Sequence, residues 1–274
     1  MRHVTIVLYR KWAEGRWVRK ETAQRLSLLT REFYARTSAS FSATRSAPWE
    51  GWQRVLDEMR SDEGCSYGLR VLDLACGNLR FERFLAKAWQ PGLVEAFAVD
   101  ACDALALADD VPGVAVRYQH LDVVEALSRE AGLASSLEAS DCDLSACFGF
   151  MHHLPLPEQR LRVLEALIEC ARPGGIVAVS FWQLSKSERL LRKAQETTAV
   201  AADALGLDDL GAGDYLLGWQ DRTDVVRYCH DFSEADIDEL ALAVAPQVKE
   251  IARFSADGGT PGLNRYLLLR RSPD

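Results

Sequence analysis

Three aspartates follow one another at the ends of three apolar segments, a pattern suited to holding a nucleoside. Asp73 lies in the run 69–75, Asp100 closes the run 94–100, and Asp122 follows the run 114–121. If these runs are parallel strands, an acid ending the second one can accept hydrogen bonds from both ribose hydroxyls. A carboxylate after the third strand can accept one from the exocyclic amine of adenine. Each acid alone suits a helix N-cap equally well, but three in succession favour a ligand site.

The turn after Asp73 narrows the choice of ligand. The segment Ala75-Cys76-Gly77-Asn78-Leu79 contains one glycine, so the dinucleotide pattern G-x-G-x-x-G is absent. A nicotinamide or flavin cofactor is therefore disfavoured. The alternative interpretation is an ordinary tight turn between a strand and a helix.

A histidine pair, His152-His153, follows the fourth apolar run. Adjacent side chains point in different directions, and no acidic or cysteine partner stands at ligand spacing in the sequence, so we expect no metal site. We expect one histidine to face a pocket at the end of a strand and the other to be structural.

Alternating strands and helices must position these residues. Repeated alternation with short connections predicts an α/β fold, a doubly wound and mostly parallel sheet covered on both faces. Two closing runs, 247–254 and 264–271, predict an antiparallel C-terminal hairpin at its edge, which completes seven strands. The other predicted strands are 69–75, 94–100, 114–121, 142–150 and 176–182, and the helices between them are 79–89, 101–108, one within 123–138, and 157–170.

Two segments fall outside that alternation. Residues 1–60 hold 12 Lys/Arg, 6 Asp/Glu and many aromatics, although the whole chain of 274 residues carries a net charge of −8. We expect this segment to be helical and to lie on the substrate side of a second domain spanning 61–274, whose insertion 185–244 helps to cover the pocket. Basic residues among aromatics can bind phosphates and stack on bases; the alternative is a helical lid that packs on the sheet.

Composition excludes several classes of protein. The net charge argues against a non-specific coat on nucleic acid, and no apolar run approaches the length of a membrane span. The basic start lacks a cleavage site typical of a signal peptide. Seven cysteines without C-x-x-C spacing indicate reduced thiols, so we expect a cytoplasmic protein without membrane contact.

Taken together, the chain resembles the class I S-adenosylmethionine-dependent methyltransferases. The resemblance spans about 69–182 and the last two strands, and includes Phe148-Gly149-Phe150-Met151-His152-His153-Leu154 and Arg172-Pro173-Gly174-Gly175. It implies S-adenosyl-L-methionine as cofactor. The residues that it places at the cofactor are Asp73, Ala75, Gly77, Asn78, Asp100, Ala101, Asp122, Val123, Phe148 and Gly149.

A narrower resemblance connects the chain with the eukaryotic tRNA wobble-uridine methyltransferases, which esterify 5-carboxymethyluridine. It is carried by Phe41-Ser42-Ala43-Thr44-Arg45 with Pro48-Trp49, by Glu158-Gln159-Arg160, by Phe181-Trp182-Gln183, and by Gly213-Asp214-Tyr215 with Arg227-Tyr228-Cys229-His230. The chain departs from that family at Ala75 and Leu79, where glycine is usual.

This second resemblance implies an acceptor site. A carboxylate acceptor is already ionised at neutral pH and needs a cation rather than a base, and a guanidinium fork suits it. The resemblance therefore assigns Arg45, His152 and Arg227 as catalytic residues, tRNA as substrate, and a small activator subunit as a partner. A small-molecule carboxylate or other metabolite is the main alternative acceptor, and a non-catalytic cofactor- or partner-binding relative is the second alternative.

Overall fold

A seven-stranded sheet forms the centre of the molecule. The computed structural model describes residues 18–60, 68–89, 92–106, 110–220, 222–258 and 262–273. The strand order is β3-β2-β1-β4-β5-β9-β8, parallel from β3 to β5 and antiparallel where β9 pairs with β5 and β8. This confirms the predicted fold class. The strands are β1 (Gly68–Leu74), β2 (Leu93–Asp100), β3 (Val114–His120), β4 (Cys142–Cys147), β5 (Ala171–Trp182), β8 (Val248–Ala256) and β9 (Asn264–Arg271).

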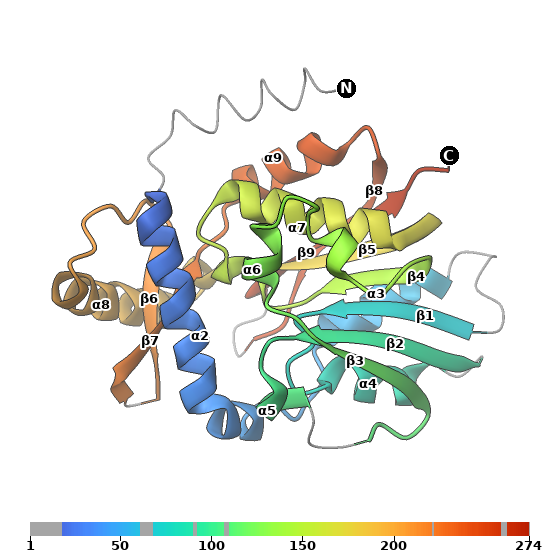
Figure 1. Cartoon of the computed structure of the whole chain (residues 1–274), viewed down its shortest axis with the longest axis horizontal. Helices are drawn as coiled ribbons and strands as arrows, with labels where there is room; N and C mark the ends of the chain where they lie inside the picture. Colours follow the sequence, from blue (N-terminus) through green and yellow to red (C-terminus); the bar gives the residue numbers. More distant parts are fainter. Residues whose placement is uncertain are drawn as a thin grey trace.

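Helices cover both faces of the sheet because its strands alternate buried side chains between two cores (Figure 1). In β1, Leu69 and Val71 pack on α3 (Glu50–Arg60) and α4 (Arg80–Ala88). Leu72 and Leu74 belong to the other core, with α6 (Val123–Leu127), α7 (Pro157–Cys170) and α9 (Glu234–Val244). Short helical turns complete the connections: α5 (Asp103–Ala106), η1 (Ala134–Ser136), η2 (Met151–His153) and η3 (Leu184–Lys186).

A second layer of structure stands beside one end of the sheet. The long helix α2 (Lys20–Ala43) runs along a two-stranded sheet of β6 (Asp214–Trp219) and β7 (Arg222–His230), and α8 (Glu188–Leu205) packs on β6 (Figure 1). A separate hydrophobic cluster joins them, with Leu26, Leu216 and Tyr228 fully buried. The helix α9, although it belongs to the segment 185–244, packs instead on α7.

The structure corrects three details of the prediction. The pair β6–β7 was not predicted, because its turn at Gln220 adopts a positive φ of 52° without the glycine that signals a hairpin. The strand predicted over 176–182 begins earlier, because β5 starts at Ala171, directly after α7 ends at Cys170. Strand β4 ends at Cys147 rather than Phe150, because Gly149 has φ +74° and η2 follows.

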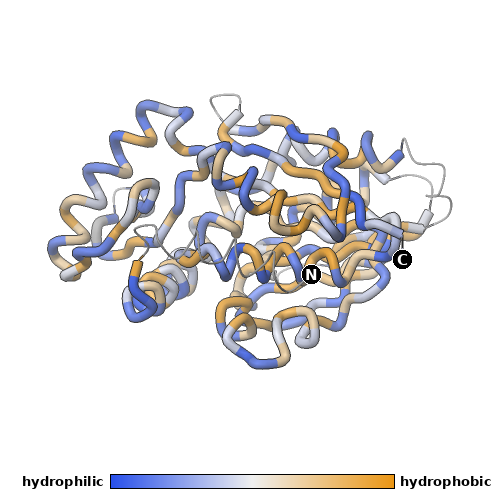
Figure 2. The backbone as a smooth tube through the Cα atoms, turned by 90° about the horizontal axis from the view of Figure 1, so that it is seen from above, coloured by the Kyte–Doolittle hydropathy of each residue, from blue (hydrophilic) through white to orange (hydrophobic). Residues whose placement is uncertain are grey.

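Hydropathy follows this architecture. Figure 2 shows the longest hydrophobic stretches in the middle of the molecule, where the strands of the sheet lie, and hydrophilic residues along its outer parts. Among the helices that the structure describes, none combines the length and the apolarity needed to cross a bilayer. The described cysteines are all free thiols.

Candidate functional site

A cavity of about 1040 Å³ lies at the carboxyl ends of β1, β2 and β4 and extends beneath α2 and β7. Its volume is at the upper limit of the 300–1,000 Å³ that is usual for small-molecule sites, so it has room for more than one ligand. Every predicted site residue contributes to its lining. These residues are Arg45, Asp73, Ala75, Gly77, Asn78, Asp100, Ala101, Asp122, Val123, Phe148, Gly149, His152 and Arg227.

The turn after β1 is held against β2 by Asp100. The Gly77 amide donates to one carboxylate oxygen of Asp100 at 2.9 Å, and the Cys102 amide donates to the other at 2.8 Å. Burial raises the pKa of Asp100, and these amide bonds oppose the rise. A Cβ at Gly77 would find no atom within 4 Å, so open space adjoins this turn. Asp100 is thus an oriented acceptor beside an open, small-residue backbone.

The same turn carries backbone strain. Ala75 and Leu79 adopt φ of 65° and 57°, in the left-handed region that glycine tolerates best. Both positions are those at which the resembling family usually has glycine. The turn therefore holds alanine and leucine in a backbone conformation that suits glycine better.

Asp122 caps a helix and also lines the cavity. Its Oδ1 accepts from the Glu125 amide at 3.1 Å, which caps α6, while Oδ2 lies 3.5 Å from the guanidinium of Arg31 on α2. It lines the cavity beside Val123. The cap orients the carboxylate at the cavity wall.

Gly149 marks the closest approach of two distant segments. A Cβ built on it would lie 3.0 Å from the Trp49 ring, and its own amide donates to Ser180 Oγ at 2.9 Å. Phe148, its neighbour, packs against Trp52 and Phe81. The indole of Trp49 therefore covers the backbone at the end of β4.

Asn78 fastens the two halves of the site together. Its side-chain amide donates to Ser42 Oγ at 3.0 Å and to the Arg45 carbonyl at 3.1 Å. The end of α2 is thereby attached to the turn that follows β1.

Arg45 and Arg227 face the cavity from opposite segments. Arg227 is only 7% exposed, and its Nε and Nη1 have no hydrogen-bond partner. It lies over the rings of Phe33 and Phe41, and Arg45 lies 4.8 Å from the Phe41 ring. Burial, together with the charge of Arg227, lowers the pKa of Arg45. Across the described residues, no ion pair joins either arginine to a carboxylate, so the pair presents uncompensated positive charge.

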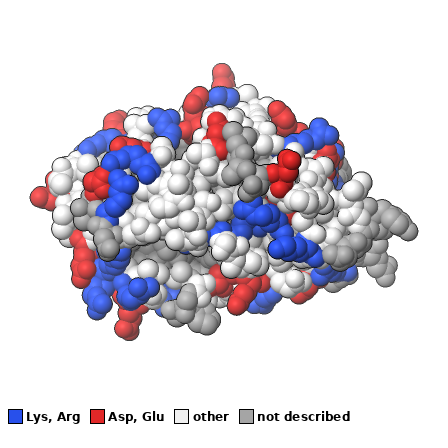
Figure 3. Space-filling view, turned by 90° about the horizontal axis from the view of Figure 1, so that it is seen from below, with Lys and Arg blue, Asp and Glu red and all other residues white. Residues whose placement is uncertain are grey.

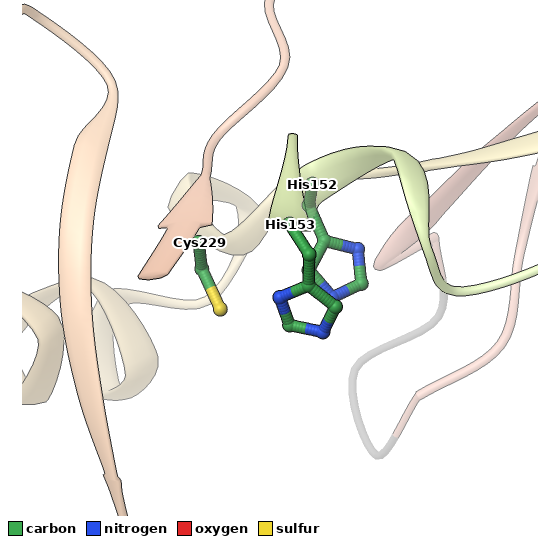
Figure 4. A group of neighbouring side chains, drawn as sticks. All are labelled: His152, His153 and Cys229. Atoms are coloured by element: carbon green, nitrogen blue, oxygen red, sulfur yellow. The ribbon is translucent and has the colours of Figure 1, made fainter. Parts of the chain in front are cut away.

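The histidine pair has a neighbour that the sequence did not reveal. His152, His153 and Cys229 bring potential ligand atoms within 4.8 Å of one another (Figure 4), which corrects the expectation that no cysteine adjoins the pair. Cys229 is 76 positions from His153, and only the β7–η2 contact unites them. A cation is nevertheless disfavoured here, because the buried Arg227 acts on both histidines and on Cys229.

The two histidines differ in their bonding. His153 donates from Nδ1 to the Tyr228 carbonyl at 2.7 Å, so its Nε2 accepts from the Tyr34 hydroxyl at 2.9 Å. Burial lowers the pKa of His153 to about 3 and that of His152 well below its usual value. His152 lines the cavity with Nδ1 unpartnered. Both rings are neutral at pH 7, with His153 structural and His152 available to a ligand.

Sequence reasoning missed Glu82, which is completely buried behind Asp73. Neither carboxylate oxygen of Glu82 meets a donor, and the two carboxyls face each other. Burial raises the pKa of Glu82 to about 7 and that of Asp73 well above its usual value. An acid at the core-facing position of an otherwise apolar helix surface was the signal that could have identified it.

The basic N-terminal segment does not form one bare patch over its described part. Arg19 pairs with Asp208 and Asp209, and Arg36 pairs with Asp224 on β7. Figure 3 shows groups of Lys and Arg separated by groups of Asp and Glu on one face of the molecule. Predictions that fall on residues 1–17 lie outside the described residues.

Comparisons with known proteins give one relative of comparable length. “Putative methyltransferase ECU09_1500” of Encephalitozoon cuniculi is 31% identical over 214 residues, which cover 76% of this chain and 82% of that protein. The “tRNA (carboxymethyluridine(34)-5-O)-methyltransferase ALKBH8” of Macaca fascicularis is 24% identical over 175 residues, covering 61% of this chain but only 22% of that protein. No family model matches the chain.

The solved structures show the fold. The 1,6-didemethyltoxoflavin-N1-methyltransferase of Burkholderia thailandensis, with bound 1,6-didemethyltoxoflavin and S-adenosylhomocysteine, superposes with a TM-score of 0.56. It covers 92% of this chain and 91% of its own, at 15% identity. The chain therefore has the Rossmann-like fold of S-adenosylmethionine-dependent methyltransferases.

Proposed function

The chain belongs to the methyltransferase family that includes the Encephalitozoon protein, and from that premise we propose that it transfers a methyl group from S-adenosylmethionine to a carboxylate. The observation that carries the proposal is the pair Arg45 and Arg227, two guanidinium groups without carboxylate partners at the end of a cavity lined by acids at its other end.

The residues at the carboxyl ends of the strands fit the cofactor. Asp100 is oriented by two amide donors and retains lone pairs for ribose hydroxyls. The open space beside Gly77 leaves its backbone accessible, and Asp122 with Val123 offers an acceptor and an apolar wall for adenine. S-adenosylmethionine supplies an electrophilic methyl group on a sulfonium.

The residues at the other end fit an anionic acceptor. A carboxylate is ionised at neutral pH, so methyl transfer to it needs alignment and exclusion of water rather than a general base. The fork of Arg227 can hold both carboxylate oxygens, and it becomes paired only when an anion enters. His152, neutral and with Nδ1 free, can contribute one further hydrogen bond.

For the acceptor we favour the carboxymethyl group of a wobble uridine in tRNA. Support comes from the motif Phe41–Arg45, which the structure places at the cavity, and from the name of the Macaca relative. The rings of Phe41 and Trp219 lie 5.2 Å apart beside Arg45 and Arg227. Aromatic rings beside cations suit an unstacked base attached to phosphate.

A free small-molecule carboxylate is the second candidate. It is favoured by the pairing of Arg19 and Arg36 with acids of this chain, because those cations are then less available to a phosphate backbone.

Labelled cofactor separates these candidates. The protein is incubated with methyl-labelled S-adenosylmethionine and either total tRNA or an extract freed of RNA. Label that enters tRNA and is released by mild alkali indicates a methyl ester on tRNA. Alkali-labile label confined to small molecules supports the metabolite. Cofactor binding without transfer to either supports a non-catalytic relative. Arg54→Ala, outside the cavity, is the control for Arg227→Ala.

A further inference from the structure

Two buried carboxyl groups lie behind the cofactor end of the cavity, and neither forms an ion pair with a described cation. Asp73 is 3% exposed and lines the cavity, and Glu82 is 0% exposed on α4. No ion pair involves either acid within the described parts of the chain. Two adjacent acids in a dry site cannot both ionise, so the pair holds at least one proton.

The charged and titratable groups around the pair do not neutralise it. The α4 arginines oppose the rise only from a distance: Arg80 lowers the pKa of Asp73 and Arg83 that of Glu82. Neither pairs with these acids, because Arg80 donates to the Ala47 carbonyl and Arg83 to that of Asn78. The remaining groups add negative potential or none when protonated. They are Asp100 from β2, Cys76 from the turn and Cys147 from β4.

We propose that both acids are protonated in the free protein, and that binding of the cofactor's cationic part beside Asp73 expels one of the two protons. The Asp73–Glu82 pair then becomes a singly charged counter-ion that shares the remaining proton, with Glu82 positioning Asp73 from behind. This inference rests on the proposed use of S-adenosylmethionine. On binding, one proton leaves the carboxyl pair for solvent, and the pair gains one negative charge, which the ligand cation compensates. The raised pKa values of both acids agree with a proton held in the free protein near pH 7.

Glu82 is thus a positioning residue that acts through Asp73. A purely structural acid would be more stable as a leucine in this core, since an unpaired buried polar group costs free energy. What the second acid adds is a partner that holds the remaining proton against the Asp73 carboxylate. The consequence is a cofactor affinity that rises with pH while the pair is protonated in the free protein.

Calorimetric titration of the full chain with S-adenosylmethionine tests this. Titrations at pH 7 in phosphate and in Tris, whose ionisation enthalpies differ, count the protons released on binding. We expect roughly one proton per cofactor in the wild type, falling towards zero at higher pH as the pair ionises beforehand. Release with S-adenosylhomocysteine too would assign the effect to the ammonium group, and release with S-adenosylmethionine alone would assign it to the sulfonium.

Two variants of the pair and one control variant make the test specific. Glu82→Gln places an amide donor against the Asp73 carboxylate, so it should bind the cofactor without releasing a proton. Glu165→Gln removes another glutamate whose pKa burial raises, on α7 and away from the cavity, and should release as the wild type does. Asp73→Asn, a second variant with circular dichroism as a check of folding, should also abolish release.

The outcomes that overturn the inference are cofactor binding with no proton released by the wild type, or undiminished release by Glu82→Gln. Absence of any binding would overturn the proposed function itself, and this inference with it.

Discussion

The two ends of the cavity are built from opposite charges and in opposite ways. The cofactor end takes Asp73, Asp100 and Asp122 from the ends of neighbouring strands, within 50 residues of sequence. The acceptor end takes Arg45 from the segment after α2 and Arg227 from β7, which are 182 positions apart. A parallel sheet brings the first set together by topology alone, whereas the second set depends on packing of α2 against the β6–β7 pair. The first set therefore follows from the sheet itself, whereas the second depends on elements outside the sheet.

Acid should affect the acceptor end first. Burial holds the pKa of His153 at about 3, below its usual value near 6.5, so the unfolded chain binds more protons between those values. Stability that is present above pH 6.5 should fall as pH decreases towards 3, by roughly 5 kcal/mol at most. Urea unfolding measured from pH 8 to pH 4 checks this, and His153→Gln should flatten the curve.

The cofactor end should show the opposite trend. The pKa of Asp73 is raised, so its contribution to stability is present at low pH and is lost as pH rises through the raised value. At pH 5, the amide hydrogens of α2 and β7 should therefore exchange faster than those of β1 and α4. Equal protection of both regions would contradict the comparison, and His120→Asn, at an exposed histidine, should leave the pattern unchanged.

Arg227→Met should separate activity from stability. Loss of a charge-assisted, bidentate contact to the acceptor should lower kcat/KM about 100-fold, equivalent to about 3 kcal/mol. Folding should tolerate the change, because a buried guanidinium without a carboxylate partner is replaced by an apolar side chain of similar length. Kinetics and thermal unfolding are measured together, with Arg54→Met as control.

A variant that unfolds at a much lower temperature would mean that Arg227 is structural. A fully active variant would remove the acceptor role.

Gly149→Ala should destabilise the contact between Trp49 and the segment that follows β4. Its φ of +74° and the 3.0 Å approach of the Trp49 ring leave no room for a methyl group. We expect a loss of about 2 kcal/mol in the free energy of unfolding. Gly206→Ala is the control for backbone strain alone, because Gly206 has φ +60° but no atom within 4 Å of an added Cβ. An equal loss of stability in the two variants would mean that the Trp49 ring moves aside without cost.

Ala75→Gly should give the smallest effect, and a favourable one. The substitution relieves the left-handed strain at φ 65° and should raise the free energy of unfolding by up to about 1 kcal/mol. Denaturant unfolding measures it. Because Gly also gains freedom in the unfolded chain, a net loss would show that the turn is less strained than its dihedral angle implies.

The same contrast explains how far the sequence could be interpreted. The sheet and its acidic edge follow from periodic apolar runs and strand-end residues, which are local in sequence. Glu82 was missed because it interrupts an apolar helix face, and Cys229 because only tertiary contact brings it to His153. The β6–β7 pair was missed because its turn at Gln220 lacks the usual glycine. Local patterns therefore predicted the sheet and the strand-end acids, whereas features made by contact between distant segments were missed.

Asn78 links the two ends of the cavity through its side-chain hydrogen bonds. One side-chain amide of the β1 turn donates to Ser42 and to the carbonyl of Arg45, so we expect any shift of this turn to move the backbone of Arg45. Occupancy of one end then alters affinity at the other. By thermodynamic reciprocity, whatever factor the cofactor imposes on acceptor binding, the acceptor must impose on cofactor binding.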